Sequence, residues 1–177
     1  MRALKVAYAW VNNVDSKDHN SMLVWDGQKT VGYLIDFGTS LGADAGLGAS
    51  KEPCEGTTYA VDLKEWSLEF VTLGMHKPMC DMESPEGTSI GRFSKHVDPN
   101  EWKPYAPNIA FGQMSRQDAR WMARRLALFS RDQIVAAVSA GAYSKREDSE
   151  LLVERLIQRR DGIVKQYLGE EDEQDDP

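Results

Sequence analysis

The chain has 177 residues, 41% of them hydrophobic and 28% charged, which is typical of one soluble domain with its own core. Its formal net charge of −7 argues against nucleic acid or an anionic membrane surface as a partner. Cys54 and Cys80 are too few for a disulfide scaffold, and no apolar run is long enough to span a membrane. We therefore expect a cytoplasmic protein with free thiols.

The first 40 residues predict a helix followed by a β-hairpin. Apolar residues recur at helical spacing over Arg2–Asn12. Two short strand-like segments, Met22–Trp25 and Thr30–Ile35, are then joined by a turn at Asp26-Gly27. Asp-Gly between two apolar segments is the strongest short-range signal for a hairpin.

Two acidic clusters flank this hairpin. The first is an Asp-x-Lys-x-x-Asn pattern formed by Asp15, Lys17 and Asn20. The second is an Asp-Phe-Gly triplet that begins at Asp36. Because a hairpin brings its two ends together, we expect Asn20 and the carboxylates of Asp15 and Asp36 to converge. Such oxygen ligands predict a magnesium site.

This combination resembles the catalytic loop and the metal-binding loop of the protein-kinase-like superfamily. By that resemblance, Asp15 would be the catalytic base that receives the proton of the acceptor hydroxyl. Lys17 would be the catalytic lysine of the same loop and contact the phosphates, while Asn20 and Asp36 would hold Mg²⁺ on the phosphates of ATP. Without the resemblance, the residues also fit an Asx-turn at Asp15 and a strand that ends at Asp36.

The chain also departs from that superfamily. Val14 stands where many protein kinases carry Arg, and no Ala-Pro-Glu follows the Asp-Phe-Gly triplet. Only 14 residues precede Asp15, too few for the glycine-rich loop, strand lysine and helix glutamate of an N-terminal lobe. We therefore expect residues 1–168 to form a single kinase-like C-terminal lobe, α+β and mostly helical, with a small hairpin that carries both loops. Its missing N-terminal lobe would lie on another segment or on a partner chain.

The middle of the chain predicts one helix between two irregular segments. Gly42–Gly56 is rich in glycine and small residues, so we expect it to be among the most mobile parts of the body. Val61–Leu73 has apolar residues at helical spacing and is followed by glycine. Met75–Asn108 contains several prolines and predicts a long irregular segment anchored by Trp102 and Tyr105.

Capping signals define three helices in the last third of the chain. Ser115 begins a helix that runs to about Phe129. Capping boxes, in which a serine is followed three residues later by Gln or Glu, begin the other two. These boxes are Ser130 with Gln133, for a helix over Arg131–Ala140, and Ser144 with Glu147, for a helix that ends near Leu168.

The last helix has an apolar stripe on one side and arginines elsewhere. The stripe consists of Leu152, Leu156, Ile163 and Tyr167. We expect Arg155, Arg159 and Arg160 to lie on the solvated face, with the binding of an acidic partner as the alternative role. Residues 169–177 form an acidic tail that should be disordered.

Two further patterns bear on function. Cys54, His76, Cys80 and His96 could supply a Cys2His2 metal site, although they lack the tight ligand pairs that structural zinc sites prefer. The runs YLIDFGTSLG, WKPYAPNIAF and IQRRDGI resemble a group of bacterial proteins of unassigned function that carry a kinase-like loop and extend further upstream.

The resemblance implies an ATP-dependent phosphotransferase lobe that binds Mg²⁺ and a nucleotide, acts on an unknown phosphate acceptor and is inactive without its N-terminal lobe. The alternative is a non-catalytic, pseudokinase-like module that serves in binding or as a scaffold. A third interpretation is a helical adaptor in which the Asp-Phe-Gly triplet is accidental.

Overall fold

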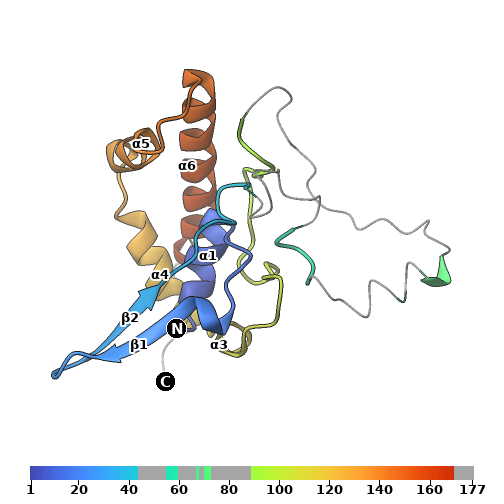
Figure 1. Cartoon of the computed structure of the whole chain (residues 1–177), viewed down its shortest axis with the longest axis vertical. Helices are drawn as coiled ribbons and strands as arrows, with labels where there is room; N and C mark the ends of the chain where they lie inside the picture. Colours follow the sequence, from blue (N-terminus) through green and yellow to red (C-terminus); the bar gives the residue numbers. More distant parts are fainter. Residues whose placement is uncertain (44–54, 60–66, 68–69, 73–88, 170–177) are drawn as a thin grey trace. The chain divides into compact units, whose positions relative to one another are not determined.

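The computed structural model describes residues 1–43, 55–59, 67, 70–72 and 89–169. These residues form several helices and a two-stranded antiparallel sheet, so the expected α+β class with a small hairpin is confirmed (Figure 1). The chain divides into two compact units. The helical unit contains Met1–Val11, Lys95–Asn100 and the chain from Ala110 onward, whereas the hairpin unit contains Asn12–Ser94 and Glu101–Ile109.

The α-helices match the sequence predictions closely. Those with both ends among the described residues are α1 (Leu4–Val11), α3 (Ile109–Gly112), α4 (Arg116–Ala127), α5 (Arg131–Ser139) and α6 (Arg146–Leu168). The four helices predicted at the start and in the last third are all present, with ends within two residues of those expected. The single turn of α3 is an addition that no pattern predicted.

Reciprocal side-chain caps begin α4 and α5; the sequence predicted the helix start at Ser115 and the capping box at Ser130. The Oγ atom of Ser115 accepts from the backbone N–H of Asp118 at 3.2 Å, and Asp118 Oδ2 accepts from the backbone N–H of Ser115 at 2.9 Å. Ser130 and Gln133 form the same pair in front of α5. Each box satisfies backbone donors that have no partner inside the helix.

The capping box predicted at Ser144 is wrong. The residue at the N-cap of α6 is Lys145, and no side chain caps this helix. Ser144 therefore lies one position too early for its hydroxyl to reach the N–H groups of the first turn.

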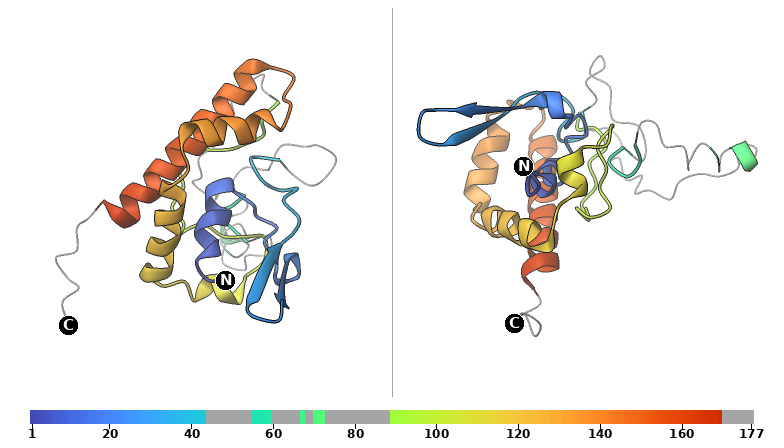
Figure 2. Two further views of the ribbon diagram at one scale, coloured as in Figure 1. Left: turned by 90° about the vertical axis from the view of Figure 1, so that its left-hand side faces the viewer. Right: turned by 90° about the horizontal axis from the view of Figure 1, so that it is seen from below.

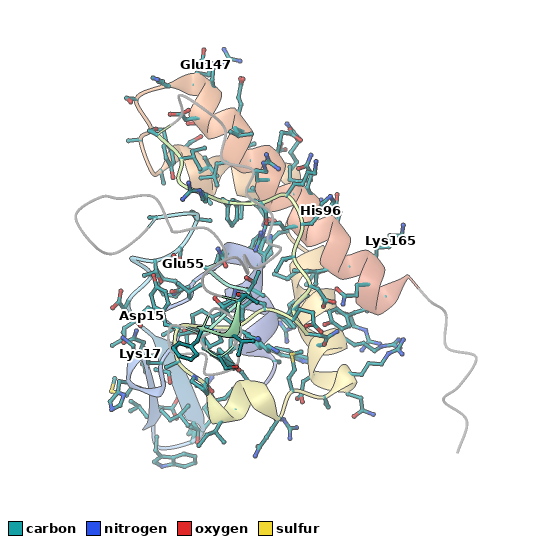
Figure 3. All side chains as sticks on the ribbon, turned by 90° about the vertical axis from the view of Figure 1, so that its right-hand side faces the viewer. Asp15, Lys17, Glu55, His96, Glu147 and Lys165 are labelled. Atoms are coloured by element: carbon teal, nitrogen blue, oxygen red, sulfur yellow. The ribbon has the colours of Figure 1, made fainter. Side chains whose placement is uncertain are left out.

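The core of the helical unit lies where α1 contacts α4 and α6 (Figure 2). Its buried members are Val6, Ala119, Met122, Ala123, Leu126, Ile163 and Tyr167. The predicted apolar stripe of α6 is confirmed, because all four of its residues are buried. Glu147 near the start of α6 and Lys165 near its end, both labelled in Figure 3, are exposed.

One arginine of α6 contradicts the sequence prediction. Arg159 is only 3% exposed instead of lying on the solvated face. Its Nη2 atom donates to the carbonyl oxygen of Ala9 at 2.6 Å, and its Nε atom donates to that of Trp10 at 2.8 Å. These carbonyls belong to the last turn of α1, where backbone acceptors lack partners within the helix and attract a cation. Burial of Arg159 is thus explained by the end of α1.

The hairpin unit contains β1 (Ser21–Trp25) and β2 (Thr30–Leu34), which pair in the predicted antiparallel arrangement. The register aligns Trp25 with Thr30, so four residues form the connection. Asp26 Oδ1 accepts from the backbone N–H groups of Gln28 and Lys29, at 2.9 and 2.8 Å. The turn is therefore held by its own first side chain.

Both faces of the hairpin are open to solvent. Met22 and Tyr33, which are paired, are 54% and 50% exposed. Leu23 and Trp25 point to the opposite face and are 59% and 65% exposed. Among the described residues, the hairpin has no third strand beside it. Its position in the fold is therefore determined at its base rather than along its strands.

Several predictions about the middle of the chain lie wholly or mostly outside the described residues. These are the mobility of Gly42–Gly56, the helix over Val61–Leu73, the disordered tail after Gly169 and the Cys2His2 site, of which only His96 is described. Within residues 89–108 the predicted irregular segment is confirmed, since they contain no helix or strand. In the part of the chain that the structure describes, no helix is both long and apolar enough to cross a bilayer.

Candidate functional site

The candidate site begins where α1 ends. Asn12 follows the helix with a φ of 53°, in the left-handed region that commonly terminates helices and that Asn tolerates better than most residues. The next residues form an extended loop up to the short 3₁₀ helix η1 (Asp18–Asn20), which leads directly into β1. This loop contains Asp15 and Lys17 (Figure 3).

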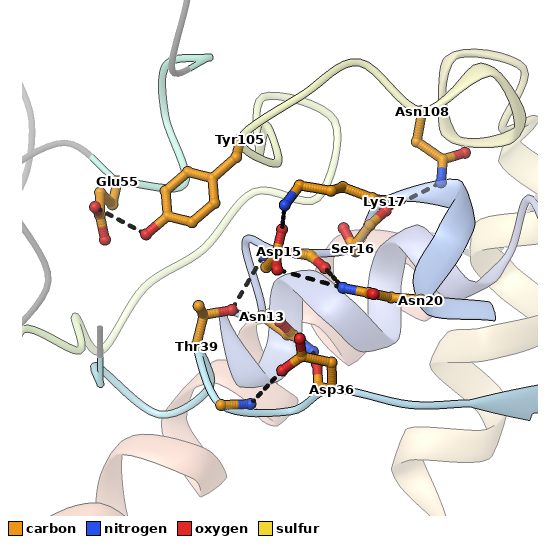
Figure 4. A network of polar contacts seen from close by, with 11 residues as sticks. Asn13, Asp15, Ser16, Lys17, Asn20, Asp36, Thr39, Glu55, Tyr105 and Asn108 are labelled. Atoms are coloured by element: carbon orange, nitrogen blue, oxygen red, sulfur yellow. Dashed lines mark hydrogen bonds and ion pairs between the residues drawn. The ribbon is translucent and has the colours of Figure 1, made fainter. Parts of the chain in front are cut away.

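Asp15 is surrounded by partners from its own loop (Figure 4). Its Oδ1 atom forms an ion pair with Lys17 Nζ at 2.6 Å. Its Oδ2 atom and its backbone carbonyl oxygen both accept from Asn20 Nδ2, the former at 3.3 Å. Because the amide nitrogen of Asn20 faces Asp15, its Oδ1 atom is the one left to face a cation.

The base of the hairpin brings Asn20 next to Asp36. The backbone N–H of Ile35 donates to the carbonyl oxygen of Asn20 at 3.0 Å and thus extends the strand pairing by one step. Asp36 follows at once, with a left-handed φ of 60°. Its side chain is exposed, and its Oδ1 atom accepts from the backbone N–H of Gly38 at 3.3 Å. The structure therefore brings together Asp15, Lys17, Asn20 and Asp36.

A buried polar network links the two loops, and sequence reasoning missed it. Asn13, which is fully buried, donates from Nδ2 to the carbonyl oxygen of Asp36 at 3.0 Å. Its Oδ1 atom accepts from Thr39 Oγ1 at 2.6 Å. Thr39 Oγ1 in turn accepts from the backbone N–H of Asp15 at 3.1 Å. Two features of the sequence could have indicated this network. Asn13 lies between a helix end and the acidic pattern, and Thr39 comes directly after Asp-Phe-Gly.

The irregular segment over residues 101–109 supports the same loop from another direction. Its predicted anchor Trp102 is 3% exposed and donates from Nε1 to Asn12 Oδ1 at 2.9 Å. The backbone N–H of Tyr105 donates to the carbonyl oxygen of Val14 at 2.8 Å. Asn108 Nδ2 donates to the carbonyl oxygen of Ser16 at 3.1 Å. Every second residue of the loop from Asn12 to Ser16 is thus hydrogen-bonded to this segment.

Two further residues complete this support. Gly56 lies against the contact between Asn12 and Trp102, where a Cβ atom would come within 2.5 Å of Asn12 Oδ1. The hydroxyl of Tyr105, the other predicted anchor, donates to Glu55 Oε1 at 3.0 Å (Figure 4). Residues separated by many positions in the sequence therefore hold the loop of Asp15 on both sides.

Asn20 and Asp36 offer donor atoms of the type that a hard divalent cation binds. The Oδ1 atom of Asn20 and the carboxylate of Asp36 are oxygen ligands, the type that Mg²⁺ prefers. Mg²⁺ is commonly bound by one or two protein oxygens, with phosphates and water completing its octahedron. Among the described residues, no three His, Cys, Asp or Glu side chains form an all-protein metal site. The arrangement fits a shared ion better than a structural one.

Neither a family model, nor a curated protein, nor a solved structure matches this chain. The argument for function therefore depends on the residues of the site.

Proposed function

We propose that this site binds the phosphates of a nucleoside triphosphate together with Mg²⁺ and serves phosphoryl transfer of the kinase type. One observation carries the proposal: Asp15, Lys17 and Asn20, from the loop before the hairpin, lie at its base together with Asp36 from the segment after it. The set contains two carboxylates, one ammonium group and one amide. These are the residue types that phosphoryl transfer uses for positioning and charge neutralisation.

Each residue has a role that its contacts support. Asn20 Oδ1 and the Asp36 carboxylate would hold Mg²⁺, which when bound neutralises charge on the phosphate oxygens. Lys17 lies beside Asp15 and is half-exposed, so its ammonium group can turn towards a phosphate. In the transfer itself, the acceptor hydroxyl oxygen bonds to the γ-phosphorus, the bond from that phosphorus to the bridging oxygen of the diphosphate breaks, and the hydroxyl proton passes to Asp15.

A nucleotide would bind weakly to the described residues alone. The ammonium group of Lys17 already forms an ion pair with Asp15 at 2.6 Å. A nucleotide must therefore compete with an existing ion pair. We expect the dissociation constant for Mg-ATP to be in the high micromolar range, about −5 kcal/mol in binding free energy.

Calorimetry with Mg-ATP tests the proposal. Asp36→Asn should weaken binding about tenfold, because it replaces the charged cation ligand with a neutral one. Asp132→Asn removes the same charge from an exposed position on α5 and should leave binding unchanged. Absence of binding, or equal binding by the wild type and Asp36→Asn, would exclude this site.

One observation favours binding without turnover as a second candidate function. Both oxygens of Asp15 have partners, Oδ1 in Lys17 and Oδ2 in Asn20, so an incoming hydroxyl competes with Lys17 and Asn20 for the carboxylate. Release of ADP or phosphate from Mg-ATP separates the two functions. Binding that depends on Asp36, with no release above the buffer rate, supports the binding module.

A further inference from the structure

We propose that Asn13 and Thr39 are positioning residues that couple the cation ligand Asp36 to the candidate base Asp15. This inference rests on the proposed function, because it assigns to two residues outside the motif a role in that same site. Neither residue belongs to the acidic patterns from which the site was predicted. Their side chains are 0% and 1% exposed.

The coupling is a continuous chain of hydrogen bonds with a fixed direction. The backbone N–H of Asp15 donates to Thr39 Oγ1, and the hydroxyl of Thr39 donates to Asn13 Oδ1. Asn13 Nδ2 then donates to the carbonyl oxygen of Asp36. The Thr39 hydroxyl acts at once as acceptor and donor, and both ends of the Asn13 amide are used. A neutral side chain without a hydroxyl at position 39 would break two of these bonds together.

The network holds Asp36, whose backbone is in an unfavourable conformation. Asp36 has a left-handed φ of 60°, which costs a non-glycine residue free energy unless its surroundings hold it. Asn13 binds the carbonyl oxygen of this same residue, whereas the exposed carboxylate of Asp36 is held by the Gly38 N–H. Asn13 therefore holds the backbone of Asp36 and leaves its side chain accessible to a cation.

The Thr39 hydroxyl can be removed without a large change in volume. Thr39→Val keeps the branched shape and loses the hydroxyl, whereas Thr39→Ser keeps the hydroxyl and loses a methyl group. The probe is the complex of Mn²⁺ with ATP, titrated calorimetrically into the full chain, with Asp36→Asn to identify binding at the site. We expect Thr39→Val to weaken the Asp36-dependent binding about tenfold and Thr39→Ser to remain within about twofold of the wild type. Thr30→Val, at an exposed position of β2, controls for the substitution itself.

A second measurement needs no variant. Coupling is reciprocal, so a cation held by Asn20 and Asp36 must also strengthen contacts at the other end of the network. Saturation with Mg²⁺ should slow hydrogen exchange of the Asp15 amide, whose acceptor is Thr39 Oγ1, by several-fold. The amide of Asp26, at the far end of the hairpin, is the internal reference.

The outcomes separate the two proposals. If the wild type shows no binding of Mn-ATP that depends on Asp36, the proposed function fails, and with it the coupling. If binding depends on Asp36 but Thr39→Val binds as the wild type does, the function stands and the coupling is wrong. Should Thr39→Val fail to fold, the exchange measurement decides: an Asp15 amide that does not respond to saturating Mg²⁺ overturns the coupling.

Discussion

Arg159 Nη2 lies 2.6 Å from the carbonyl oxygen of Ala9 and donates a hydrogen bond to it. The interaction joins the middle of α6 to the last turn of α1, across 150 positions of the sequence. The same guanidinium binds the carbonyl oxygens of Trp10 and, at 3.3 Å, His96. The buried guanidinium thus donates to three backbone oxygens, which the planar fork of Arg can reach together and a single ammonium group cannot.

Replacement of Arg159 by Met should destabilise the protein by about 2–4 kcal/mol, because it leaves backbone acceptors without a donor in a buried place. Arg159→Lys should recover only part of this loss, since one ammonium group cannot bind several carbonyls at fixed angles. Urea unfolding measures both. Arg124→Met, at an exposed position of α4, is the control and should change the unfolding free energy by less than about 0.5 kcal/mol.

The helical spacing of the sequence indicated that Arg159 is buried, but its positive charge favoured the opposite prediction. The buried residues Leu152, Leu156, Ile163 and Tyr167 follow each other at helical spacing, and Arg159 lies three positions after Leu156 and four before Ile163. Spacing therefore placed it on the apolar stripe. The charge of the side chain, by contrast, favoured a solvent-exposed position. Burial is decided by the backbone acceptors at the end of α1, which have no partner within that helix and lie far away in the sequence.

The capping serines provide a test with a control built into the sequence. Ser115→Ala and Ser130→Ala should each lower the unfolding free energy by about 1 kcal/mol, since each removes a side-chain acceptor from a helix start. Ser144→Ala should cost no more than a few tenths of a kcal/mol, because Ser144 caps nothing. Equal losses at all three positions would show that Ser144 does cap α6 in solution.

Substitution of two glycines by alanine distinguishes the cost of backbone strain from that of steric overlap. Gly27 has a φ of 101° and open space where a Cβ would be, so Gly27→Ala should cost about 1–2 kcal/mol from strain alone. Gly56 has a φ of 94°, and a Cβ there would also overlap Asn12 and Trp102. Gly56→Ala should therefore cost at least about 3 kcal/mol in urea unfolding. A loss no larger than that of Gly27→Ala would contradict the close approach at Gly56.

Alkaline pH should destabilise the helical unit through Tyr167. Burial and the negative charge of Asp98 raise the pKa of Tyr167 to about 12. Because the pKa is raised in the folded state, the contribution of Tyr167 to the free energy of unfolding is fully present below the ordinary value of 10.0. It is lost as the pH rises towards 12. The loss should amount to roughly 1–2 kcal/mol.

Tyr167→Phe should remove this part of the pH dependence, because the variant has no phenol to ionise. The measurement is urea unfolding of both proteins at several pH values between about 9 and 11.5. The substitution leaves every other ionisable side chain in place, so the difference in slope isolates Tyr167. Parallel curves would show that the phenol ionises as easily in the folded state as in the unfolded chain.

Local signals account for the parts of the fold that could be predicted. The hairpin follows from Asp26 and Gly27, and the starts of α4 and α5 follow from serines whose partners lie three residues away. The gathering of Asn20 and Asp36 follows from the hairpin, since the strand pairing sets their distance.

Contacts between distant segments account for what could not be predicted. No periodicity marks Asn13 as the partner of Thr39, because two buried polar side chains leave no repeating pattern in the sequence. Ser144 does not cap α6 because the helix begins one residue later than the box requires, with Lys145 at the N-cap. Patterns in a sequence do not define helix ends to one residue. The exposure of both hairpin faces likewise could not follow from strand alternation, which assumes that one face is buried.

The contact between Asn12 and Trp102 spans 90 positions, and that between Ser16 and Asn108 spans 92. Closing loops of this length is entropically costly, whereas the hairpin closes locally within about 10 μs. The order of folding follows from this difference: the hairpin can form while the loop of Asp15 is still unsupported on one side. The candidate site should thus be completed late in folding, after Trp102 and Asn108 have reached the loop of Asp15.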